Sequence, residues 1–71
     1  MKNNENYVAS FNGRQVDLFD YDGRPVRRFT TKAEVVNAVV TGSGQDAKVA
    51  ITMKDGHYIV YTSSGRVYRQ N

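Results

Sequence analysis

Four glycine-containing dipeptides divide this chain into short segments and constrain its fold more than any other feature. They are Asn12-Gly13, Asp22-Gly23, Asp55-Gly56 and Ser64-Gly65. Asn-Gly and Asp-Gly favour two-residue type I′ loops between antiparallel strands, because both loop positions adopt positive φ. A two-residue loop also fixes which residues lie opposite each other, so each predicted register can be compared with the hydrophobic pattern.

The first loop predicts a hairpin with one apolar face. With Asn12-Gly13 at its tip, Phe11 lies opposite Arg14 and Ala9 lies opposite Val16. Side chains alternate across a strand, so this register groups the apolar residues on one side of the ribbon. The predicted core face consists of Tyr7, Ala9, Phe11, Val16 and Leu18.

The second loop extends this hairpin to a three-stranded meander. With Asp22-Gly23 at its tip, Asp17 and Arg28 face each other as opposite charges. Because Pro25 cannot donate a ladder hydrogen bond, we expect the third strand to lie at a sheet edge. The same register pairs Val16 with Phe29 and Phe19 with Val26.

The last two loops predict a second meander. Asp55-Gly56 places Ile51 opposite Val60, and Ser64-Gly65 returns a final strand over residues 66–70. The predicted core face consists of Val49, Ile51, Met53, Tyr58, Val60 and Val67. The predicted outer face consists of His57, Ile59, Tyr61, Arg66 and Tyr68.

The segment between the meanders, FTTKAEVVNAVVTG at residues 29–42, carries signals for both a strand and a helix. Its valines favour a strand but do not alternate with polar residues. At 100° per residue the apolar side chains fall within an arc of about 160°. Thr31 and Glu34 form a capping box, and Gly42 stands where a left-handed residue ends a helix. We therefore predict a helix over about residues 31–41 and an α+β fold of order β-β-β-α-β-β-β.

The glycine spacing offers an alternative. Gly13 and Gly56 are 43 residues apart, and Gly23 and Gly65 are 42 apart, which is the period of a β-propeller blade. In that interpretation residues 35–41 are the inner strand of a blade, and several copies of the chain close the ring. The helix is favoured because its start, its apolar face and its end agree.

The 71 residues are enough for one small domain, which we expect to span residues 7–71 after a disordered tail at residues 1–6. The chain contains no cysteine, so it has no disulfide framework or thiolate metal site. No segment is apolar enough for a signal peptide or a membrane span. We expect a cytoplasmic protein without membrane contact.

No set of catalytic groups can be assembled from the sequence. His57 is the only histidine and adjoins a turn, and the turn aspartates are explained by turn chemistry. We expect no enzymatic activity, cofactor, metal or small-molecule substrate.

Two binding surfaces remain as candidates. The first is the arginine-bearing sheet of the N-terminal meander, which could enter a DNA major groove. Its residues are Arg14, Phe19, Arg24 and Arg28. The second is the aromatic and basic side of the C-terminal meander, which could stack unpaired bases. Its residues are Lys54, His57, Tyr61, Arg66 and Tyr68.

The net charge of +3 is spread thinly along the chain, and the same arginines and tyrosines also suit an ordinary strand surface. Because Phe19, Ile59 and Tyr61 face outward in the predicted registers, we expect a protein partner or a second copy to cover them. The favoured function is a small non-enzymatic protein that binds a partner, or associates as a dimer, through an outward sheet face. The alternative is a nucleic-acid-binding module that uses the arginine-bearing sheet.

The stretch GRPVRRFTTKAEVVNAV resembles the strand-to-helix junction F-x-T-K-x-E-A of small domains that combine a three-stranded sheet with one helix. These include the arm-binding domains of tyrosine recombinases and the plant GCC-box binders. It is similar, too, to short bacterial domains of unknown function that close with a turn such as Gly65-Arg66. The resemblance covers residues 7–40 and depends on Phe29, Thr31, Lys32 and Glu34. It implies groove contacts by Arg14, Arg24 and Arg28.

The chain departs from this pattern in two ways. Three aspartates place negative charge on the same sheet, and the whole second meander is additional. The aspartates are Asp17, Asp20 and Asp22.

Overall fold

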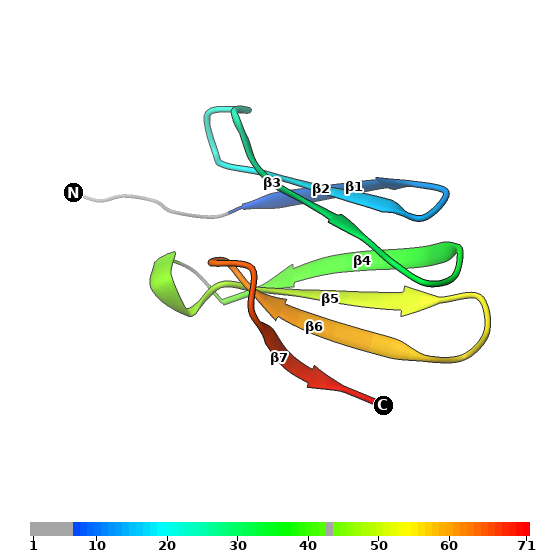
Figure 1. Cartoon of the computed structure of the whole chain (residues 1–71). Coiled ribbons are helices and arrows are strands. Elements are labelled where there is room, and N and C mark those ends of the chain that lie inside the picture. The colour runs from blue at the N-terminus through cyan, green and yellow to red at the C-terminus, as the bar shows by residue number, and fades with distance from the viewer. Residues whose placement is uncertain (1–6, 43) are drawn as a thin grey trace.

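The computed structural model describes residues 7–42 and 44–71, which form seven strands and one short 3-10 turn (Figure 1). The first sheet contains β1 (Val8–Asn12), β2 (Gln15–Phe19) and β3 (Pro25–Thr30). The second contains β4 (Val35–Thr41), β5 (Lys48–Met53), β6 (Tyr58–Thr62) and β7 (Val67–Gln70), with the 3-10 turn at Gly44–Asp46 between β4 and β5. The predicted tail at residues 1–6 lies outside the described residues.

Each strand pairs antiparallel with its neighbour in the chain, so the sheet orders are β1-β2-β3 and β4-β5-β6-β7. β3 begins at Pro25 and is an edge strand, which confirms the expectation from proline. The two sheets lie one above the other (Figure 1). Both predicted meanders are therefore present, and the second one contains an additional strand, β4.

The predicted helix over residues 31–41, and with it the α+β fold class, is wrong. Val35–Thr41 is strand β4, which pairs with β5 from Val35 opposite Met53 to Thr41 opposite Lys48. A β-bulge between Val35 and Asn37 places an extra residue in this strand and interrupts the alternation. The apolar pattern of a bulged strand thus resembled that of a helix. The strand at residues 35–41 is the part of the propeller alternative that the structure contains.

The residues of the predicted capping box shape the link between the sheets instead. The Thr31 hydroxyl donates to the Ala33 carbonyl at 2.6 Å, and its oxygen lies 3.2 Å from the Arg14 carbonyl. The Thr31 amide also donates to the Arg14 carbonyl at 2.8 Å. Gly42 has a φ of +76°, as a left-handed position requires, but it begins the turn from β4 to β5.

Three of the four predicted hairpin loops are longer than expected and have the same geometry. They span residues 20–24, 53–57 and 62–66. In the first, Asp20 donates its amide to the Arg24 carbonyl at 2.9 Å, and Gly23 donates to the Asp20 carbonyl at 2.9 Å. The other two repeat both bonds. Only the glycine has a positive φ in each loop, so these are three-residue loops with a glycine bulge and the type I′ prediction is wrong.

The extra loop residue has opposite consequences in the two sheets. Between β2 and β3, a bulge between Leu18 and Phe19 compensates for the extra loop residue. The predicted pairs Val16–Phe29 and Asp17–Arg28 are therefore confirmed. Phe19 lies opposite Pro25 rather than Val26.

Between β5 and β6 no bulge compensates, and the register differs from the prediction by one residue. Ile51 faces Ile59, and Val49 faces Tyr61. Because one residue of slip exchanges the two faces of a strand, Ile59 and Tyr61 point into the core rather than outward. Tyr58, predicted inside, points outward.

The first hairpin keeps its predicted faces despite a different register. Its loop is Gly13-Arg14, and Ala9 lies opposite Leu18 instead of Val16. A shift of two residues returns each side chain to the same face. Gly13 has a φ of +62°, which suits the first position of a type II′ turn.

The core lies between the two sheets. Its fully buried aliphatic residues are Val16, Leu18, Val49 and Ile51, and the ring of Phe29 stacks on Tyr61 with centroids 4.2 Å apart. On one side the sheets meet where β1 runs beside β4, and the Val35 amide donates to the Gly13 carbonyl at 2.8 Å. On the other side Arg27 Nε donates to the Ser63 carbonyl at 3.3 Å. These contacts bring two meanders together around one core.

Candidate functional site

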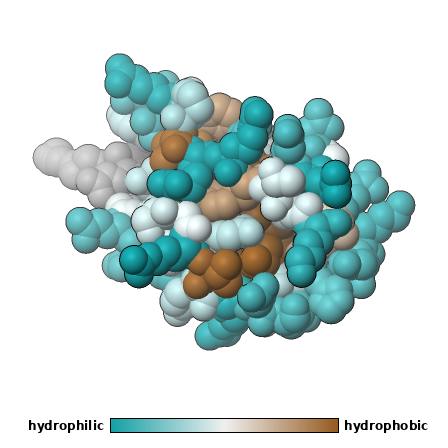
Figure 2. Space-filling view, viewed as in Figure 1, coloured by the Kyte–Doolittle hydropathy of each residue, from teal (hydrophilic) through white to brown (hydrophobic). Residues whose placement is uncertain are grey.

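The outward side of the second sheet carries an apolar row that crosses three strands. The ladder aligns Val39 of β4, Ala50 of β5 and Val60 of β6, and we call these residues the outer apolar row. Val39 is 45% exposed, and the other two are half-buried. Figure 2 shows one side of the molecule, on which hydrophobic residues reach the surface among hydrophilic ones. Small and β-branched side chains make this row flat.

Two tyrosines flank the outer apolar row. Tyr58 is 36% exposed and pairs with Thr52, and Tyr68 is 55% exposed at a bulge where β6 meets β7. Lys48 Nζ lies 4.7 Å from the centroid of the Tyr68 ring, and Arg69 Cζ lies 5.8 Å from it. A cation over an aromatic face is attracted by the ring quadrupole. Tyr68 therefore has two cations near its ring on an open surface.

The strands of the second sheet have an unusual balance of charge. β4 to β7 contain the basic residues Lys48 and Arg69 and no aspartate or glutamate. The carboxylates that follow β3 in the described chain lie between strands, at Glu34, Asp46 and Asp55. We call the outer apolar row, Tyr58, Tyr68, Lys48 and Arg69 together the outer face of the second sheet. It combines apolar, aromatic and positively charged groups.

The first predicted surface, the arginine-bearing sheet, uses one of its arginines, Arg28, within the protein, and so does the neighbouring Arg27. Arg28 Nε donates to Asp17 Oδ1 at 2.7 Å. This hydrogen bond, together with the charge of Asp17, raises the pKa of Arg28. Arg27 points to the opposite side and binds the Ser63 carbonyl in the other sheet.

The remaining members of that surface do not form a cluster with Arg28. Arg14 lies in the turn between β1 and β2, and Arg24 lies in the turn between β2 and β3, at the opposite end of β2. Five strand residues separate these ends by about 17 Å. Phe19 is outward and half-buried beside the bulge. The structure thus keeps the predicted arginines apart.

The second predicted surface is distributed over three regions. Tyr61 lies inside, stacked on Phe29, whereas Tyr68 lies outside. The two tyrosines, both predicted on the outer face, are separated because Tyr61 pairs with Val67. Lys54 and Arg66 lie in turns, where Lys54 Nζ is 3.9 Å from Glu34 Oε1. Of the predicted set, Tyr68 alone belongs to the outer face of the second sheet.

Most residues of this outer face were not predicted. Tyr58 and Val60 were placed inside by the one-residue error, and Val39 was assigned to the buried side of a helix. The signal that could have found them is the loop length, because Asp-Gly also ends three-residue loops with a glycine bulge. The hydrophobic pattern could not decide, since all four residues from Tyr58 to Tyr61 are apolar or aromatic.

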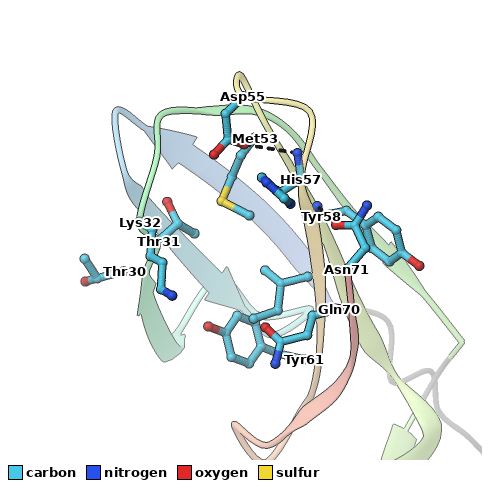
Figure 3. Close-up of a pocket in the computed structure, with 11 residues that line it drawn as sticks. Thr30, Thr31, Lys32, Met53, Asp55, His57, Tyr58, Tyr61, Gln70 and Asn71 are labelled. Atoms are coloured by element: carbon cyan, nitrogen blue, oxygen red, sulfur yellow. Dashed lines mark hydrogen bonds between the residues drawn. The ribbon is translucent and has the colours of Figure 1, made fainter.

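A pocket of about 380 Å³ opens on the opposite side of the second sheet. It lies between the C-terminal end of β3 and the strands β6 and β7 (Figure 3). Ile59, Tyr61 and Met53 provide its apolar surface. Lys32, His57 and Gln70 provide polar groups around it. We call this pocket the mouth of the two sheets. It contains His57 and Tyr61 from the second predicted surface.

No family model matches the chain, and neither a curated protein nor a solved structure is similar to it. The resemblance of residues 7–40 to sheet-plus-helix domains therefore stays a prediction. Within residues 7–42 and 44–71, no group of three or more histidine, aspartate or glutamate side chains could hold a metal ion. The same residues contain no helix of the length and hydropathy needed to cross a membrane.

Proposed function

We propose that this chain is a non-enzymatic binding protein, and that it binds a protein partner through the outer face of the second sheet. The outer apolar row carries the proposal. An outward row of Val39, Ala50 and Val60 leaves apolar area in water that a flat partner surface would cover. The partner is another protein or a second copy of this chain.

The surroundings of the row support a protein interface. Interface cores are enriched in tyrosine and arginine and poor in carboxylates, and their rims are polar. Here Tyr58, Tyr68 and Arg69 adjoin the row, and no strand of this sheet carries a carboxylate. The polar rim consists of Asn37, Thr41, Thr52 and Thr62.

Nucleic acid is the second candidate, and one observation favours it. Tyr68 lies near Lys48 and Arg69 on a face without strand carboxylates. Unpaired bases stack on exposed aromatic rings while nearby cations meet the phosphates. The surface proposed for nucleic acid is therefore on the second sheet. The arginine-bearing first sheet is less suitable because Asp17 neutralises Arg28.

A photo-crosslinking experiment tests the proposal. A benzoylphenylalanine replaces Val39 in one variant and Val8 in the control, since Val8 is 59% exposed on the outer side of the first sheet. We expect one discrete adduct from position 39 and none from position 8. An adduct of twice the chain mass would identify a second copy, and one containing a different polypeptide would identify a separate partner.

The same experiment can contradict the proposal. An adduct with RNA or DNA at position 39 would favour the second candidate. Equal adducts at both positions, or none at position 39, would exclude the outer face of the second sheet as a protein interface. Urea unfolding of both variants shows whether each is folded, which is expected because both positions are exposed.

A further inference from the structure

The two sheets meet along strands on one side, whereas on the other side Arg27 Nε, which donates to the Ser63 carbonyl, links them without a strand pair. β1 runs beside β4, so the first side is closed by strands. On the second side, β3 is an edge of the first sheet and β7 is an edge of the second, and these two strands do not pair. The mouth lies on this open side, next to Thr30, Thr31 and Lys32 at the end of β3 (Figure 3).

β3 offers main-chain hydrogen-bonding groups along the open side. It pairs with β2 through one edge, and no strand among the described residues pairs with its other edge. The amide and carbonyl groups at alternate residues of an edge strand point away from the sheet. An extended peptide can pair with such groups as an added strand, and pockets beside the edge then select its side chains.

The groups in the mouth indicate the chemistry of that peptide. Ile59, Met53 and Tyr61 form an apolar surface deep between the sheets, which suits an apolar side chain. Lys32 stands at the rim. The carboxylate in the lining, Asp55, accepts the His57 amide at 3.0 Å through Oδ1 and so belongs to its own turn. Lys32 lies two residues after the end of β3, on the edge that the peptide main chain would follow, so it offers a cation to a carboxylate of that peptide.

We propose that β3 and the mouth form a binding site for an extended acidic peptide. The peptide main chain pairs with the free edge of β3, an apolar side chain enters the mouth against Ile59 and Tyr61, and a carboxylate meets Lys32 at the rim. The mouth has the volume of a small ligand pocket, enough for one or two side chains. This site lies across the second sheet from the outer face and does not depend on the function proposed for that face.

An amide NMR titration with a blocked peptide, acetyl-Glu-Val-Glu-Phe-Glu-Val-amide, tests the proposal. We expect shifts at residues 27–32 and 59–61 and none at residues 37–41. A peptide N-methylated at every residue has no main-chain N–H group to donate to an edge strand, and we expect it not to bind. Lys32→Glu is expected to weaken binding about tenfold, and the matched variant Lys48→Glu, on the outer face, by less than about twofold.

Several results would overturn the proposal. They are the absence of shifts with the wild-type protein at millimolar peptide, shifts confined to residues 37–41, equal binding of the N-methylated peptide, and equal binding by Lys32→Glu. Unchanged spectra of the free variants establish that each is folded. Lys32→Gln serves as a second variant, for which we expect a smaller loss in the same direction.

Discussion

The outer side of the first sheet carries Asp17 and Arg28 in a salt bridge of 2.7 Å, whereas the outer side of the second carries Val39, Ala50 and Val60. Both sheets are built from consecutive antiparallel strands and contain the same glycine-bulge loop. The difference therefore arises from side chains and not from topology. The first outer face pairs its charges beside the apolar pair Val8 and Phe19, whereas the second carries an apolar row with two cations and no strand carboxylate.

Leu18→Ala tests whether the two sheets unfold as one cooperative unit, and its effect is the largest that we expect. Leu18 belongs to the first sheet and is fully buried against the second. Its truncation should lower the free energy of unfolding by about 2–5 kcal/mol, most of the stability of a domain this small. Urea unfolding followed by circular dichroism and by amide exchange at Ile51 provides the measurement. Protection at Ile51 that survives the loss of the first sheet would contradict a shared core.

Gly42 and Gly56 lie in two turns of the second sheet that differ in the room they leave for a side chain. An added Cβ at Gly42 would lie 2.6 Å from the Asp46 carbonyl oxygen, whereas at Gly56 nothing lies within 4 Å. Both residues have positive φ, so each alanine variant carries a backbone strain of about 1–2 kcal/mol. Gly42→Ala must also displace backbone, and we expect its total cost to be roughly 2–4 kcal/mol. Equal thermal midpoints for the two variants would show that the turn at Gly42 adapts freely.

The link between the sheets can be weakened at Thr31, which is buried. Thr31→Val removes the hydroxyl that binds the Ala33 carbonyl, and it leaves the volume nearly unchanged. We expect a loss of about 1 kcal/mol in the free energy of unfolding, because the half-buried Ala33 carbonyl loses a hydrogen-bond donor. Thr30→Val is the matched control, since Thr30 is exposed on β3, and it should be nearly neutral in the same urea titration. A larger loss at Thr30 would assign the effect to the strand.

The smallest expected effect concerns the outer face of the first sheet. Asp17→Asn removes the salt bridge to Arg28, but both side chains reach solvent and salt screens exposed charges. We expect the smallest shift of the urea midpoint in the series, and we expect about 1 M NaCl to remove most of the difference from wild type. A shift comparable to that of Leu18→Ala would mean that this pair, and not the core, holds β2 to β3.

The sequence allowed four hairpin turns, both meanders and the edge position of β3 to be predicted, but not the turn between β4 and β5. It did not reveal loop length, because Asp-Gly occurs in both two-residue and three-residue loops. For β2 and β3 the error cancelled at the bulge beside Phe19, and for β5 and β6 it did not. The inward and outward sides of β6 were exchanged as a result, so Tyr58 was placed on the wrong side. Tyr68 of β7 was placed on the correct side because a further bulge separates the pairs Tyr61–Val67 and Val60–Arg69.

The helix prediction failed for a related reason. The bulge after Val35 is not marked by glycine or proline, and its extra residue gives the valines the spacing of an amphipathic helix. Valine favours a strand, and β5 supplies a complete ladder for it. The residues that pair with this strand lie outside residues 29–42. The pattern of apolar residues within that stretch therefore could not distinguish a strand from a helix.

Residues 31–34 are the one place where the chain crosses from the first sheet to the second, and no hydrogen-bonded ladder spans them. A cut in this connection would leave each sheet whole within its own fragment. The two fragments would then bind each other through the same buried residues that form the core of the intact chain. Separate expression of the halves should thus yield a complementing pair, whose reassembly reports directly on the fit between the two inner faces.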